Sequence, residues 1–169
     1  MRVFPSLFTA ACLLFTGTPV FAAISSANIQ ACINVDVAPL APINVNFIAG
    51  SGTDQCMSAS GTDEPLTVDT KGLNCVSIGN VASSADDDDN SCDTLPSAWT
   101  LSYHTDDYAQ SGTARTSWAA ESDELRDSVS LKETSPGTQI CPEEANCDAT
   151  SQDWDHNTTP DIYIIFNME

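Results

Sequence analysis

The sequence predicts a mostly β protein, a single disulfide-stabilised β-sandwich or barrel-like domain with at most one short helix. Short segments alternate apolar and polar side chains with a period of two residues, which is typical of strands with one buried face. Glycine, proline, asparagine and aspartate recur between these segments as turn formers, and helical periodicity is scarce. This combination favours one mostly-β domain.

Residues 1–22 have the organisation of a signal peptide. A cationic start and an apolar stretch are followed by Val20-Phe21-Ala22, which offers the small or apolar residues that a signal peptidase recognises. We therefore expect residues 23–169 to form one secreted, extracellular β-rich domain. The most apolar segment after the leader, residues 162–166, has only the length of a strand, so we expect no membrane span.

The strands are expected in the following order. Period-two alternation predicts strands with one buried face at residues 33–37, 43–47 and 99–103, and residues 66–68 and 75–78 are further short strand candidates. Turns or proline-broken connectors are expected at residues 38–42, 51–54, 60–63 and 136–137.

Two later segments complete the predicted architecture. Residues 118–131 are the one helix candidate, with Ser117 as a cap, although residues 127–131 also alternate and would suit a strand. Residues 162–166 are apolar on both faces, which predicts a central strand that closes the sheet beside residues 99–103.

The cysteines are expected to be structural. One of the seven, Cys12, lies in the leader, and the remaining even number in an exported chain predicts three disulfides. These six residues are Cys32, Cys56, Cys75, Cys92, Cys141 and Cys147. The short loop between Cys141 and Cys147 favours a local bridge, while the other pairings stay open. The chain lacks the close C-x-x-C pairs of zinc sites, and the even count leaves no cysteine for catalysis.

The chain is strongly acidic. It has 24 acidic and five basic residues, a formal net charge of −19. Such a field repels nucleic acid and anionic lipid and favours a partner that carries positive charge. The densest cluster is Asp86–Asp89, whose consecutive aspartates point in divergent directions. We therefore expect a solvated loop there rather than a calcium site, and we expect no metal and no cofactor.

Catalytic motifs are missing from the sequence. It contains no G-x-S-x-G, no H-E-x-x-H and no phosphate-binding glycine loop. The alternative to a non-enzymatic protein is a small secreted hydrolase, ribonuclease- or glycosidase-like. Such an enzyme would use His104 and His156 as acid and base, with Arg115 holding a phosphate. The acidity of the chain argues against a polyanionic substrate.

We therefore expect a non-enzymatic effector or surface interaction protein that binds a host or cell-wall protein or carbohydrate. Tyr108, Trp118 and Trp154 are candidates for an aromatic sugar-binding platform, with Trp154 the best exposed candidate, although tryptophans more commonly lie in the core. Asn157 begins an Asn-Thr-Thr triplet, an acceptor for N-glycosylation in a eukaryotic host. The profile of leader, length, six cysteines and absent enzyme motifs is similar to that of small secreted cysteine-rich effectors of plant-associated fungi. That compositional resemblance implies the same interaction role.

Overall fold

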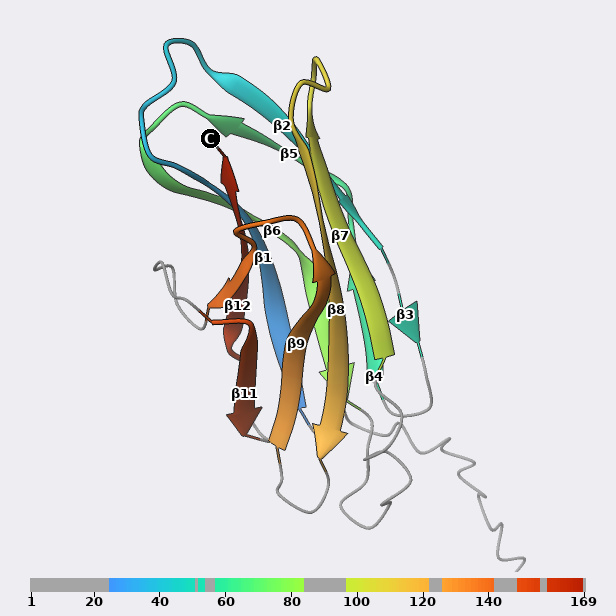
Figure 1. The fold of residues 1–169 in the computed structure, drawn as a ribbon. Coiled ribbons are helices and arrows are strands. Elements are labelled where there is room, and N and C mark those ends of the chain that lie inside the picture. The colour runs from blue at the N-terminus through green and yellow to red at the C-terminus, as the bar shows by residue number, and fades with distance from the viewer. Residues whose placement is uncertain are drawn as a thin grey trace, which may run out of the picture.

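The computed structural model describes residues 25–50, 52–53, 57–83, 97–121, 126–141, 149–155 and 158–168, and these form two six-stranded sheets. The two sheets pack face to face in an elongated sandwich, and one of them curls into a half-barrel (Figure 1). This confirms the predicted β-rich architecture. Within the part of the chain that the structure describes there is no helix, and hence none that is long and apolar enough to cross a bilayer.

Sheet A has the strand order β10-β12-β1-β6-β4-β3. Its strands are β1 (Ser25–Val35), β3 (Gly52–Thr53), β4 (Met57–Gly61), β6 (Gly72–Ser83), β10 (Gln139–Cys141) and β12 (Asp161–Met168). The pairing of β1 with β12 is parallel, whereas the other pairs described in this sheet are antiparallel.

Sheet B has the strand order β11-β9-β8-β7-β2-β5, with antiparallel pairs throughout its described residues. Its strands are β2 (Ile43–Ala49), β5 (Glu64–Val68), β7 (Ser97–Thr105), β8 (Ser111–Glu121), β9 (Arg126–Thr134) and β11 (Ser151–Asp155).

Most predicted strands and turns are found where the sequence placed them. Four of the five predicted strands fall within β2, β5, β6 and β7, and the fifth, residues 33–37, overlaps β1, which ends at Val35, two residues earlier than predicted. A turn at Pro136 and Gly137 links β9 to β10. The predicted turn at residues 60–63 is shorter, because Ser60 and Gly61 still pair with β6 as the end of β4. Of residues 51–54, only Gly52 and Thr53 are described, and they form β3.

The predicted helix over residues 118–131 is wrong. The segment belongs to the antiparallel pair of β8 and β9, in which Trp118 lies opposite Val129 and both side chains are fully buried. Ala114, Thr116 and Trp118 are buried at every second position, which is the periodicity of a strand. The period-two alternation that residues 127–131 show in the sequence is therefore also present around Trp118. Residues 122–125 lie outside the described part of the chain.

The tryptophans form a row in the core. The ring centroids of Trp99 and Trp118 are 6.5 Å apart, and those of Trp118 and Trp154 are 6.1 Å apart, both in edge-to-face arrangements. Trp118 Nε1 donates to Thr116 Oγ1 at 2.7 Å, and Thr116 Oγ1 donates to the Trp99 carbonyl at 3.1 Å. Trp99 Nε1 donates to the Gly50 carbonyl. These bonds satisfy the indole N–H groups of Trp99 and Trp118, whereas Trp154 Nε1 is buried without a hydrogen-bond partner.

Both faces of β12 are apolar because each face packs against other apolar residues. Ile162, Ile164 and Phe166 point into the main core, while Ile165 joins a second cluster with Cys32 and Cys141. The expected neighbour relation with residues 99–103 needs correction, because β7 and β12 belong to different sheets. They meet across the core, where the rings of Tyr103 and Phe166 are 4.9 Å apart in an edge-to-face contact.

One disulfide is described completely, between Cys32 and Cys75. These residues lie directly opposite each other on β1 and β6, so the bond staples the two central strands of sheet A. Cys141 is also disulfide-bonded. Cys56, Cys92 and Cys147 lie outside the described residues, and the Cys141–Cys147 bridge stays a prediction.

Candidate functional site

A stacked aromatic pair marks one end of sheet B. His104 lies on the outer face of β7, and its ring stacks on that of Tyr108, with centroids 4.1 Å apart and planes 8° from parallel. Tyr108 belongs to the turn between β7 and β8 and is 72% exposed. His104 Nδ1 lies 3.0 Å from the Thr105 carbonyl oxygen. Histidine therefore supports one face of the tyrosine ring, and the opposite face is open to a partner.

The turn holds Tyr108 in an unfavourable backbone conformation. Tyr108 has a φ of 55°, in the left-handed region that glycine and asparagine adopt more readily. The turn is fixed by Asp107, whose carboxylate accepts hydrogen bonds from Thr105 Oγ1 at 2.6 Å and from the Ala109 amide at 3.0 Å. These hydrogen bonds, that of Thr105 first, hold the pKa of Asp107 below its ordinary value. A large aromatic residue at the strained position points to a function other than folding.

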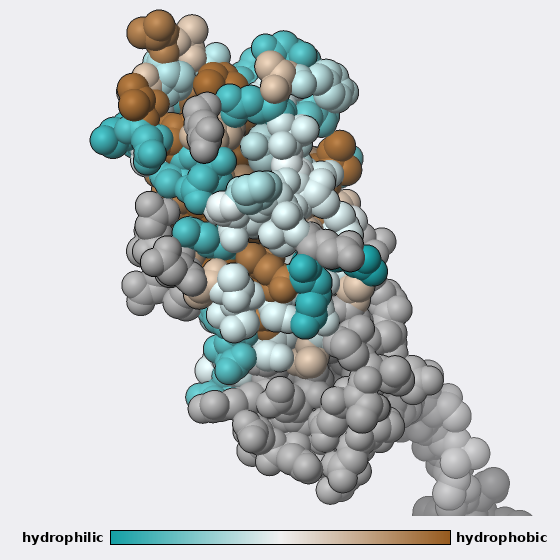
Figure 2. Space-filling model, in the orientation of Figure 1, coloured by the Kyte–Doolittle hydropathy of each residue, from teal (hydrophilic) through white to brown (hydrophobic). Residues whose placement is uncertain are grey.

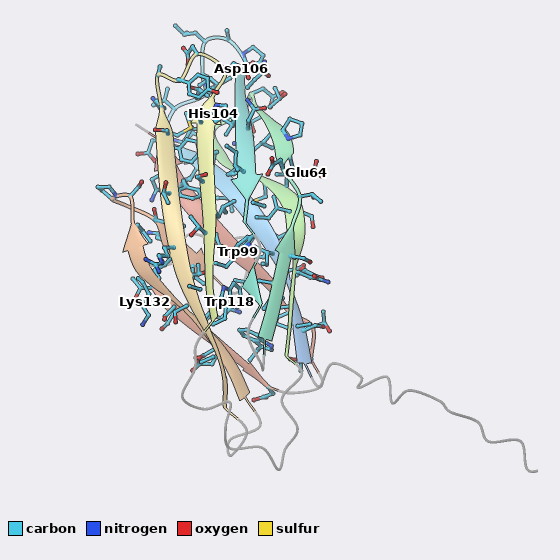
Figure 3. All side chains as sticks on the ribbon, turned by 90° about the vertical axis from the view of Figure 1, so that its right-hand side faces the viewer. Glu64, Trp99, His104, Asp106, Trp118 and Lys132 are labelled. Carbon is cyan, nitrogen blue, oxygen red and sulfur yellow. A yellow bond between two sulfur atoms is a disulfide. The ribbon has the colours of Figure 1, made fainter. Side chains whose placement is uncertain are left out.

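A carboxylate beside the stack is also fixed in position. The Asn46 amide donates to Asp106 Oδ1 at 2.8 Å, and the Asn44 amide donates to Asp106 Oδ2 at 3.1 Å. Asn44 Oδ1 accepts in turn from Thr67 Oγ1 at 3.3 Å. Figure 3 shows Asp106 and His104 at the same end of the sandwich, with Lys132 well away from them.

Two neighbouring surface hollows lie along β2, and the side chains just described form part of their walls. The first, of about 270 Å³, is lined by Pro42, Ile43, Asn44, Thr105, Asp106 and Asp107. The second, of about 370 Å³, is lined by Asn46, Phe47, Ile48, Asp63, Glu64, Pro65 and His104. We call the two hollows together the β2 trough, and the open ring of Tyr108 with its His104 support the aromatic platform.

An apolar pocket lies at the loop between β1 and β2 and shares Ile43 with the first hollow of the β2 trough. Val37 and Leu40 in this loop are 78% and 108% exposed, and they line a cavity of about 420 Å³ with Pro39, Ile43 and Met168 among its other walls. Figure 2 shows hydrophobic residues gathered at this end of the molecule. The turn that carries Tyr108 lies at the same end (Figure 1).

The predicted hydrolase residues are only partly described. His104 pairs with Ser111 and Arg115 pairs with Thr100, so Arg115 lies four residues further along the sheet, about 13 Å away. An arginine at that separation cannot hold a phosphate against the His104 ring. His156 lies outside the described residues. Its described neighbour Asp155 is level with Glu121, at the opposite end of β8 from Ser111.

The remaining predicted sites have mixed outcomes. Trp118 and Trp154 are buried, so the prediction that they share an exposed platform with Tyr108 is wrong for both, since their rings fill the core. Asn157 and the Asp86–Asp89 cluster lie outside the described residues. Among the residues that are described, no group of three or more histidine, cysteine or acidic side chains is arranged to hold a metal.

The sequence reasoning missed Asn44, Asn46 and Asp106. The alternation of β2 does place both asparagines on its polar face, but their contact with Asp106 joins positions 60 or more apart in sequence. In comparisons with protein-family models, curated proteins and solved structures, no match was found for this chain.

Proposed function

We propose that this protein is an exported, non-enzymatic binding protein, an effector or surface-acting factor that holds a host or cell-wall partner on the aromatic platform and the β2 trough. The observation that carries the proposal is Tyr108, an exposed aromatic ring kept in a strained backbone conformation and supported from behind by His104. Exposed, rigid aromatic residues are typical anchors of binding surfaces.

The arrangement supports binding better than catalysis. His104 has its ring packed against Tyr108, and Arg115 is about 13 Å along the sheet. Asp106 has both carboxylate oxygens engaged by asparagine amides, which fixes an acceptor in place. A fixed acceptor beside an aromatic face recognises a partner without needing to transfer a proton.

The test compares variants of the exported chain for retention on isolated cell walls and intact cell surfaces. Tyr108→Asn removes the ring and suits the left-handed backbone, and it should abolish retention. The matched control is Leu40→Asn, which removes a fully exposed apolar side chain from a different loop and should leave retention unchanged.

A parallel assay measures degradation of RNA and polysaccharides. We expect none from the wild-type protein or from His104→Gln. Degradation that disappears in His104→Gln would establish the hydrolase alternative, and equal retention of Tyr108→Asn and wild type would refute the platform.

A further inference from the structure

We propose that the β2 trough binds a glycan built from neutral or amino pyranose sugars, with one sugar ring stacked on the open face of Tyr108. This inference rests on the proposed function, and it names the chemical class of the partner. Three properties lead to it: the rigid aromatic face of the platform, and the polar groups that mostly accept hydrogen bonds and the extended shape of the trough.

The aromatic face suits the apolar face of a sugar ring. A pyranose with equatorial hydroxyls presents its axial C–H groups as a flat apolar patch, which packs on the face of an aromatic ring. Tyr108 offers one such face, because His104 covers the other at a centroid distance of 4.1 Å. The backbone and the stack both hold the ring in place before the ligand arrives, so little side-chain entropy is lost on binding.

The polar groups beside the ring select hydroxyl and ammonium donors. Each oxygen of Asp106 accepts one hydrogen bond from an asparagine amide and keeps capacity for another. Asp63, Glu64 and Asp107 add further carboxylates to the walls of the two hollows. Neither hollow is lined by a lysine or an arginine, so a phosphate or uronate ligand would meet only negative charge.

The shape of the trough suits a chain rather than a single residue. The two hollows follow β2 from Asn44 to Ile48, a distance of about 13 Å along the strand. The outward side chains along this part of β2 are Asn44, Asn46 and Ile48, so the floor is polar at the end that holds Asp106 and apolar at Ile48. The more apolar pocket that a peptide side chain would seek lies around Val37 and Leu40 and borders the trough at Ile43. A glycan therefore fits the trough better than a peptide does.

The experiment titrates the exported chain with four hexasaccharides and one peptide, followed by the side-chain amide signals of Asn44 and Asn46 in NMR spectra. The sugars are the β-1,4-linked hexamers of glucose, N-acetylglucosamine and glucosamine, and the α-1,4-linked hexamer of galacturonic acid. The peptide is octalysine. At least one of the first three sugars should shift both amide signals to saturation, and galacturonate should not.

Variants then assign the binding to the platform. Tyr108→Asn should weaken binding by about tenfold or more, and Tyr108→Trp should retain it. Asp106→Asn is a second variant that keeps the volume of the side chain, and it should also weaken binding. Leu40→Asn should bind like the wild type. A glycan that binds every variant equally would overturn the inference.

The inference and the proposed function fail in different ways. If no sugar binds but retention on cell surfaces still depends on Tyr108, the glycan inference is overturned and the binding function stands. Octalysine bound in a Tyr108-dependent manner, with no sugar bound, leads to the same conclusion and identifies a cationic protein partner. If retention is also independent of Tyr108, both proposals are refuted.

Discussion

Gly79 is the position where the methyl group of an alanine should lower the stability of the fold through direct overlap with backbone atoms. It lies in β6 opposite Gly61 of β4, beside the bulge at which the register of β1 and β6 shifts. A Cβ added there would lie 2.0 Å from the Ser60 carbonyl oxygen and 2.7 Å from the Gly61 Cα. These neighbours are backbone atoms, so no side-chain rotation can relieve the overlap, and β4 would have to move away from β6.

Gly72 is a matched control for this substitution. Its φ of 97° is also positive, but an added Cβ would have no atom within 4 Å. Gly72→Ala should therefore cost only the left-handed backbone strain, about 1–2 kcal/mol. Gly79→Ala adds overpacking of about 1–3 kcal/mol, since Ala59 and Val81 leave their core positions when the strands separate. We expect a total loss of about 2–5 kcal/mol for this variant.

The measurement is urea unfolding of both variants and the wild type, followed by fluorescence of the buried tryptophans. The free energy of unfolding should fall clearly more for Gly79→Ala than for Gly72→Ala. If both variants lose the same free energy of unfolding, β4 tolerates a side chain at Gly79 of β6. The argument from the close approach of the two backbones would then be wrong.

Three further predictions concern the core, the disulfide and the turn. Removal of residues 162–169 should abolish folding, because β12 buries five large apolar side chains worth roughly 1.5–3 kcal/mol each, and an unchanged circular dichroism spectrum and melting curve would contradict this. Replacing Cys32 and Cys75 together by alanine should lower the free energy of unfolding by about 4 kcal/mol, the loop-closure value for a separation of 43 residues, as measured by denaturant titration. Thr105→Val should raise the pKa of Asp107 toward its ordinary value in a carboxyl-carbon NMR titration. Because folding lowers that pKa, the contribution of Asp107 to stability is present above its ordinary pKa and is lost as the pH falls through the lowered one.

The fold was predictable wherever a strand has one buried face. Trp99, Leu101 and Tyr103 alternate with polar residues in β7, and all three are buried. The pattern failed at Trp118, because its spacing to Leu125 and Val129 fits one face of a helix, although Trp118 and Val129 belong to two paired strands. Only the pairing of β8 with β7 and β9 decides that case.

The candidate site was less visible than the fold for a related reason. The sequence offers Tyr108 as one of three candidates for an aromatic platform, but its left-handed backbone and its stacking on His104 depend on how the turn closes. The hydrogen bonds from Asn44 and Asn46 to Asp106 depend on the register of β2 with β7, in which Asn46 lies opposite His104. A pattern within one segment does not contain such a register.

The parallel pairing of β1 with β12 has a consequence for the order of folding. A chain can emerge amino-terminus first, from a ribosome or through a translocation pore. In such a chain β1 appears long before β12, because paired residues of the two strands are 133 positions apart. Sheet A therefore stays open on that side until the last strand has emerged, and folding by such distant contacts is slow. The Cys32–Cys75 bond needs only β1 and β6, so an oxidising enzyme could join them early. The joined strands would then form a template on which β12 docks last.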